Sequence, residues 1–94
     1  MTQDDTEAVA WFRKAADQGD AIAEFLLGNQ YANGKGVPQD YVRAHMWFSL
    51  AAAQGEQRAV KTPEMAERKM TPAQITEAQK LARDWKPATR PTPH

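Results

Sequence analysis

The chain contains no cysteine, and Ser49 is the only serine among its 94 residues. Without cysteine there is no disulfide, no thiol nucleophile and no thiolate metal site. The two histidines, His45 and His94, lie far apart in the sequence and show no metal-ligand spacing. We therefore expect no metal and no cofactor, and few of the residue types that carry out catalysis.

Long apolar runs and an excess of either charge are also missing. A membrane span needs about 20 consecutive apolar residues, and no apolar stretch of the sequence comes near that length. The N-terminal MTQDD lacks a basic, apolar signal segment. We expect no membrane binding and a cytoplasmic location as written, or a periplasmic or secreted one if the chain is a fragment of a processed precursor. Twelve basic and twelve acidic residues give zero net charge, which argues against binding nucleic acid.

The charges are nevertheless unevenly placed along the chain. Residues 1–57 carry four bases against eight acids, a net −4, and residues 58–94 carry eight bases against four acids, a net +4. An acidic head and a basic tail can attract one another between molecules. Self-association is therefore one hypothesis, and an ordinary solvated surface is the alternative.

An internal repeat with a period of 36 residues is the strongest feature that the sequence does contain. Ten of the 21 residues in 3–23 recur unchanged in 39–59. A period of about 20 to 50 residues indicates a stacked array of small units rather than one closed core. The shared positions are Gln3/Gln39, Asp4/Asp40, Ala8/Ala44, Trp11/Trp47, Phe12/Phe48, Ala15/Ala51, Ala16/Ala52, Gln18/Gln54, Gly19/Gly55 and Ala23/Ala59.

Apolar spacing predicts five helices in a row and no strand. The helices are expected over residues 6–18, 20–33, 41–54, 56–69 and 71–86. Asp4 or Asp5 can cap the first helix, and Asp40 can cap the third. The second starts near Asp20.

Glycine and proline mark the breaks between these helices. Gly19 and Gly55 follow the first and third helices, and the segment 34–38, with two glycines and a proline, is a turn. Pro63 lies inside the fourth helical pattern, which predicts either a kink or a restart with Thr62 as the cap.

Two further features concern the fifth helix and the packing of the others. Thr71 and Gln74 form a capping box at the start of the fifth helix. Alanines on the helix faces allow close approach, and bulky aromatic residues fill the space beside them. These aromatics are Trp11, Trp47, Phe12 and Phe48. The three tryptophans, including Trp85, are predicted to belong to the core rather than to stack on nucleic-acid bases.

The middle of the chain resembles the Sel-one-like repeat, a helical-pair relative of the tetratricopeptide repeat. Every position of that family's pattern is present in one unit: Ala23, Leu27, Gly28, Tyr31, Gly34, Gly36, Val37, Asp40, Ala44, Trp47, Ala51, Ala52 and Gly55. The resemblance implies an all-α fold, an α-solenoid of antiparallel helix pairs that forms a right-handed, tetratricopeptide-like superhelix.

The same pattern divides the chain into units. Residues 1–86 are expected to form the array, with a half unit at 4–19 that contains Trp11 and Gly19, and a complete unit at 20–55. Residues 56–70 form a degenerate unit, because Pro63, Glu64 and Glu67 replace its leucine, glycine and tyrosine. Residues 71–86 are expected to be a capping helix with a polar outer face, and residues 87–94 a disordered tail.

The family resemblance also implies a non-catalytic adaptor that binds a protein or peptide on the concave face made by the first helix of each pair. In the complete unit that face holds Ile22, Phe25, Asn29, Ala32 and Asn33. Phe25 packing against a neighbouring helix is the alternative. One period later the face holds Arg58, Lys61, Met65, Arg68 and Lys69. Four of these five are basic, which predicts an acidic partner or a peptide carboxylate; solvated charges are the alternative.

A catalytic alternative rests on two residues only. His45 and Ser49 are four positions apart, so they can meet on one face of a helix. Nucleophilic catalysis also requires an orienting group and donors for an oxyanion. Both residues lie off the predicted apolar stripe, so we expect them in solvent, and we expect no enzymatic activity.

Overall fold

Polar capping residues and glycines determine where the helices of the protein begin and end. The computed structural model describes residues 5–87, which contain five α-helices, one 3-10 turn and no strand. The elements are α1 (Asp5–Asp17), α2 (Ala21–Asn33), α3 (Tyr41–Ala53), the 3-10 turn η1 (Gln57–Ala59), α4 (Thr62–Glu67) and α5 (Pro72–Asp84). The all-α prediction is confirmed. Of the predicted disordered tail, residues 88–94 lie outside the described residues.

The predicted helix caps are mostly confirmed. The Asp20 carboxylate accepts a hydrogen bond from the Ala23 amide at 3.0 Å, and Asp40 accepts one from the Arg43 amide at 3.1 Å. The capping box at Thr71 is present in full. Of the two candidate caps for the first helix, Asp4 lies outside the described residues and Asp5 is its first helical residue.

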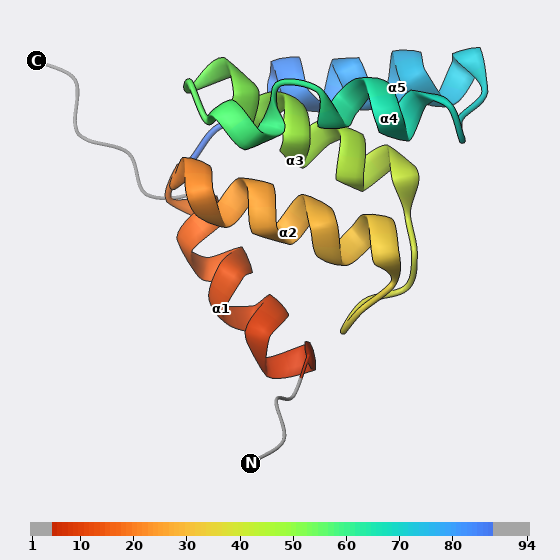
Figure 1. Cartoon of the computed structure of the whole chain (residues 1–94). Helices are drawn as coiled ribbons and strands as arrows, with labels where there is room; N and C mark the ends of the chain where they lie inside the picture. The colour runs from red at the N-terminus through yellow and green to blue at the C-terminus, as the bar shows by residue number, and fades with distance from the viewer. Residues whose placement is uncertain (1–4, 88–94) are drawn as a thin grey trace, which may run out of the picture.

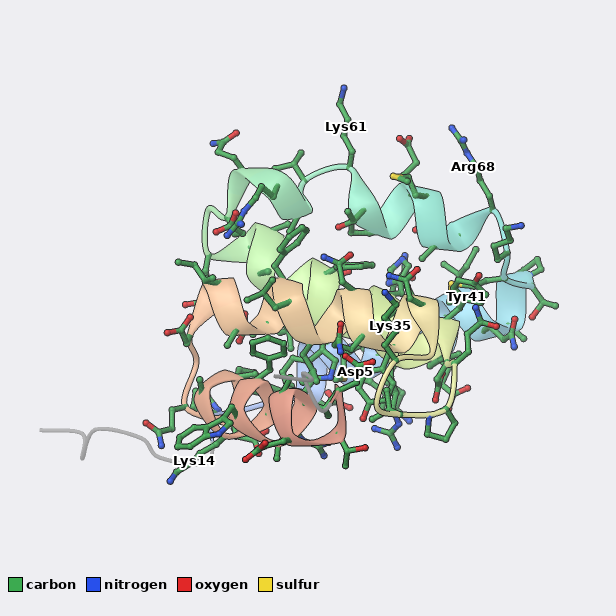
Figure 2. All side chains as sticks on the ribbon, turned by 60° about the horizontal axis from the view of Figure 1, so that its bottom comes forward. Asp5, Lys14, Lys35, Tyr41, Lys61 and Arg68 are labelled. Carbon is green, nitrogen blue, oxygen red and sulfur yellow. The ribbon has the colours of Figure 1, made fainter. Side chains whose placement is uncertain are left out.

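The helices pack in sequence order, with α3 at the centre (Figure 1). Helix α1 packs on α2, α2 packs on α3, and α3 also contacts η1, α4 and α5. Helices α2 and α3 run antiparallel, and α4 runs in the same direction as α2. Helices α2 and α4 lie on the same side of α3 (Figures 1 and 2). This is the arrangement of helical pairs that the repeat predicts.

The core lies where α2 meets α3, and the repeat motif supplies it. Leu27, Ala44 and Ala51 have no exposed surface, and Tyr31 is also buried. Gly28 lets the two helices approach closely, because a β-carbon at this position would lie 2.6 Å from the ring of Phe48. The motif residues of α2 therefore point into the stack, as the sequence indicates.

The two tryptophans that the repeat makes equivalent have opposite environments. Trp47 is 2% exposed, and its ring meets the edge of Trp85 from α5 at a centroid distance of 5.7 Å. Trp11 is 65% exposed, so the prediction that it belongs to the core is wrong. Helix α1 contacts α2 through other residues, and no described helix covers the face that carries Trp11.

The fourth predicted helix is broken, as Pro63 indicates, but the details differ. The segment forms η1 and then the six-residue α4, which starts at Thr62 with Pro63 in its first turn, where a missing amide hydrogen is tolerated. Thr62 is not the cap. Its hydroxyl donates to the carbonyl of Ala59 at 3.0 Å.

Gly36 joins the turn between α2 and α3 to the start of α1. Its φ of 78° is left-handed, and an added β-carbon would collide with the carbonyl group of Asp5 and lie 2.9 Å from Val9 Cγ2. Figure 2 shows this turn, which carries Lys35, beside Asp5. We expect Gly36→Ala to lower the free energy of unfolding by about 2 kcal/mol, because it combines a left-handed alanine with overpacking. Urea denaturation measures this loss.

Gly55→Ala is the matched control for the backbone effect. Gly55 has a φ of 92°, and nothing lies within 4 Å of the position of an added β-carbon. This variant therefore carries only the left-handed penalty of about 1 kcal/mol. Equal losses for the two variants would show that the contact between Gly36 and Asp5 does not matter for stability.

Candidate functional site

The described part of the chain has a cavity of about 260 Å³ between α2 and α4, on the side of α3 that faces both helices. Side chains of α2, α3, α4 and the turn that follows α4 line this cavity. They are Asn29, Ala32, Asn33, Tyr41, Phe48, Thr62, Met65, Ala66 and Lys69. The cavity is open to solvent, so a ligand can enter it directly.

Helical spacing explains why these residues meet. Ala32 and Asn33 come three and four residues after Asn29, which places all three toward one face of α2. On the opposite wall, Met65 and Lys69 are also four residues apart. Tyr41 and Phe48 are two turns apart on α3 and form the floor between the walls.

The cavity has one polar end. Helix α2 ends at Asn33, α3 begins at Tyr41, and Lys69 comes just after α4, so these three residues lie at the same end of the antiparallel helices (Figure 1). Lys69 is the only charged residue in the lining. An amide, a phenol and an ammonium group can all donate hydrogen bonds, so this end of the cavity favours a ligand with acceptor oxygens.

The rest of the cavity is largely apolar. Phe48 provides the floor, and Met65 and Ala66 of α4 face it across the opening. Phe48 is 3% exposed, and Gly28 beneath it leaves no room for it to move inward. The floor is therefore a fixed surface, whereas the unbranched Met65 side chain, 60% exposed, is free to adjust to a ligand.

The structure brings together only part of the predicted binding face. Asn29, Asn33, Met65 and Lys69 line the cavity, as does Ala32. Ile22 does not line it and is exposed near the other end of α2. Its role in binding stays a prediction.

Phe25 is partly buried and packs against the core. Its ring lies 6.0 Å from that of Phe48 between centroids, and the Arg58 guanidinium covers it at 4.9 Å. The alternative in which Phe25 packs against a neighbouring helix is therefore the observed one. Phe25 thus packs beside Phe48, which lines the cavity, but Phe25 does not itself line it.

The predicted basic strip does not form along the cavity. Arg58 forms an ion pair with Glu56 at 2.7 Å, which lowers the pKa of the Glu56 carboxyl and raises that of the guanidinium. Lys61 and Arg68 point away from α2 into solvent, as Figure 2 shows. The interruption between η1 and α4 changes the angular register after residue 59, so only Lys69 of the four bases reaches the cavity.

Tyr41 and Phe48 were not predicted as part of a binding face. Phe48 was assigned to the core, which is also correct, since one edge of its ring contacts the α2 backbone region and another faces the cavity. Tyr41 was predicted neither as a core residue nor as a binding residue. Its spacing of seven residues from Phe48 places both on one face of α3, and this is the signal from which Tyr41 could have been found.

His45 is buried rather than in solvent, which corrects the prediction, whereas Ser49 is half-buried. His45 is 2% exposed, its Nε2 lies 2.7 Å from Oε2 of Glu67, and its Nδ1 lies 3.3 Å from the Ser49 hydroxyl. Since an ionised carboxylate only accepts hydrogen bonds, Nε2 carries a proton and donates to Glu67. This pair fastens the last residue of α4 to the middle of α3 and thereby holds one wall of the cavity in place.

Among the described residues, no group of three or more His, Asp or Glu side chains is arranged to hold a metal ion. Within the same range, no helix is both long enough and apolar enough to cross a membrane.

Comparison with known proteins identifies relatives of part of the chain. It is 42% identical over 59 residues to a chitin synthase regulator, SKT5, of Malassezia restricta, which covers 63% of this chain and 4% of the relative. It is 36% identical over 58 residues to the Saccharomyces cerevisiae SKT5, covering 62% of this chain and 8% of that protein. The chain therefore spans less than a tenth of the length of these relatives.

A solved structure shares the fold over most of the chain. It is that of c5321, a protective antigen of uropathogenic Escherichia coli strains that displays an SLR fold. The TM-score is 0.85 at 34% sequence identity, and the match covers 90% of this chain and 18% of that protein. The family model described as the Sel1 repeat matches residues 1–20 and 21–56, which is more than half of the sequence. The chain belongs to the Sel1 repeat family.

Proposed function

We propose that this chain is a non-catalytic module that binds a protein or peptide in the cavity between α2 and α4. The observation that carries the proposal is the open cavity itself, with a fixed aromatic floor and polar side chains along its walls. The side-chain amides of Asn29 and Asn33 form no hydrogen bond with another described residue, and each can both donate and accept. An extended peptide backbone presents the matching groups.

The relatives support a protein as the partner. Two of them are named as regulators of chitin synthase, which is itself a protein. Because this chain corresponds to only a small part of those proteins, the resemblance supports the class of partner and not its identity. The fold supports the same class, since repeat arrays use extended concave surfaces for binding.

A catalytic role for Ser49, His45 and Glu67 has less support, although the three side chains form a hydrogen-bonded chain. None of them lines the cavity, so a substrate held there would not meet the Ser49 hydroxyl. We propose instead that these hydrogen bonds have a structural role and hold α4 in position. We also retain the proposal that residues 56–70 are a degenerate unit and that α5 caps the array.

Filling the cavity tests the proposed function. Peptides selected from a random displayed library on the wild-type chain are expected to bind Ala32→Trp at least about tenfold more weakly, because the indole occupies their site. Ala73→Trp, on the exposed surface of α5, is the matched control and should bind like the wild type. Fluorescence anisotropy with the selected peptides gives the dissociation constants. Equal affinity for wild type and Ala32→Trp would refute binding in this cavity.

Self-association is a second candidate, favoured by the exposure of Trp11. The Trp11 side chain is 65% exposed and lies on a face of α1 that no described helix covers. The Lys14 Nζ atom lies over its ring, 5.8 Å from the ring centroid. The opposite net charges of the two parts of the chain would add to the attraction at low salt. Light scattering at two salt concentrations tests this candidate. A mass equal to one chain at every protein and salt concentration would eliminate it.

A further inference from the structure

We propose that the cavity binds the C-terminal residue of its partner, with the terminal carboxylate at the end formed by Lys69, Tyr41 and Asn33. This inference rests on the proposed function and specifies which part of a partner chain occupies the site. It replaces the acidic tract that a strip of four bases would have recognised. The reasons are the charge, the hydrogen-bond donors and the size of the cavity.

The charge of the lining is a single positive group. Lys69 is exposed, it forms no ion pair with any described residue, and the lining contains no acid. The nearest acid in the sequence, Glu67, is occupied by His45 at 2.7 Å. One free ammonium group complements one carboxylate. A run of acidic residues would leave all but one of its charges without a partner, since Lys61 and Arg68 point elsewhere.

The Tyr41 hydroxyl can donate a hydrogen bond to a ligand. Its hydroxyl oxygen accepts a hydrogen bond from Gln39 Nε2 at 3.2 Å, and the same Gln39 amide donates to the carbonyl of Ala32 at 2.9 Å. The Tyr41 hydroxyl hydrogen therefore remains free for a ligand. Together with the Asn33 amide and the Lys69 ammonium, it provides donors on both walls and on the floor, which matches the two oxygens of a carboxylate.

The size and the apolar part of the cavity favour one terminal residue. A volume of about 260 Å³ is slightly below the about 300 to 1,000 Å³ of common ligand sites, so it does not enclose a long segment. In a C-terminal residue the carboxylate and the side chain leave the same carbon. The carboxylate can thus face Lys69 while an apolar side chain lies on Phe48 and beside Met65, and Asn29 is left for the preceding peptide group.

Two small probes that differ only in charge test the proposal. N-acetyl-leucine carries the carboxylate and the apolar side chain, and N-acetyl-leucinamide replaces the carboxylate with a neutral amide. In titrations followed by ¹⁵N NMR, we expect the acid to shift the side-chain amide signals of Asn29 and Asn33. The neutral probe should need at least about tenfold higher concentration for the same shift, because a charge-assisted contact is lost.

Variants of two lysines locate the effect. Lys69→Met keeps the length of the side chain and removes its charge, so it should abolish the difference between the two probes. Lys61→Met removes the same charge from a side chain that points away from the cavity and should leave the difference unchanged. Both residues are exposed, so neither variant is expected to unfold the chain.

Three results would overturn the inference: equal binding of the two probes, binding of neither, or a preference for the acid that survives in Lys69→Met. The proposed function is judged separately by the library peptides. If those peptides bind in the cavity but tolerate amidation of their C-terminus, the binding function stands and the terminal-carboxylate inference fails.

Discussion

Replacing Leu27 with alanine is expected to lower the free energy of unfolding by about 2 to 5 kcal/mol. Leu27 is completely buried, and it is the largest apolar side chain without any exposed surface in the described residues. It belongs to the cluster in which α1, α2 and α3 meet, so its truncation leaves a cavity that three helices would have to close together. Urea denaturation followed by circular dichroism measures the change.

The effect should be large relative to the total stability. A domain of this size is typically stable by about 5 to 15 kcal/mol, so the variant loses a substantial fraction and is expected to melt at a much lower temperature. Leu81→Ala is the matched control, because Leu81 lies on α5 and is 37% exposed. If both leucines cost the same, the assignment of Leu27 to the centre of the core is wrong.

The repeat predicts the core well because its positions are set by contacts within a unit. Ala23, Leu27 and Tyr31 are buried on α2, whose most extensive contacts are with α3 of the same unit, so their burial follows from the sequence. Trp11 has the same place in its unit as Trp47, but the burial of Trp47 depends on Trp85 from a later helix. Contacts between units depend on what is stacked next, and the pattern of one unit does not contain that information.

The candidate site shows the same limit. The α2 wall follows from uninterrupted helical spacing, and Asn29 and Asn33 lie where the sequence places them. The opposite wall was extrapolated by one period across Pro63, and there the chain forms a short 3-10 turn before α4 begins. The direction of a side chain after such a break depends on the new helix start. For this reason Lys69 reaches the cavity, whereas Lys61 and Arg68 do not.

The burial of Glu24 was not predicted from the sequence. This glutamate has no exposed surface and lies among the apolar residues of α2. Gln54 Nε2 donates to its Oε1 at 2.9 Å and to the carbonyl of Gly19 at 2.9 Å, while Oε2 has no partner among the described residues. The sequence signal for this buried acid is its position between Ala23 and Phe25, next to further apolar residues.

Burial raises the pKa of Glu24 to about 7 from its ordinary value of 4.5. Loss of hydration is the main cause, the hydrogen bond from Gln54 opposes it, and the negative charge of Asp20 adds to it. The folded chain therefore keeps a proton on Glu24 at pH values where the unfolded chain has released it. Between pH 4.5 and about 7 the folded state binds more protons, so stability falls as the pH rises.

This linkage predicts that the protein loses roughly 3 kcal/mol of unfolding free energy between pH 4.5 and pH 8 through Glu24 alone. Glu24→Gln should remove that contribution, because glutamine stays neutral and its carbonyl oxygen can still accept the hydrogen bond from Gln54. The variant is thus expected to be more stable than the wild type at pH 8 and close to it at pH 4.5. Urea denaturation at several pH values measures both curves.

Glu77→Gln, at an exposed position of α5, removes the same charge without changing a buried group. Its stability should depend on pH as that of the wild type does. The comparison isolates Glu24 because, apart from Glu24 and the exposed Glu77, every titrating group is shared by the three proteins. Should the Glu24→Gln and wild-type curves run parallel, Glu24 would not be the group that takes up the proton on folding. A buried carboxylate would then have to be stabilised by contacts beyond the bond from Gln54, because an uncompensated buried charge is costly.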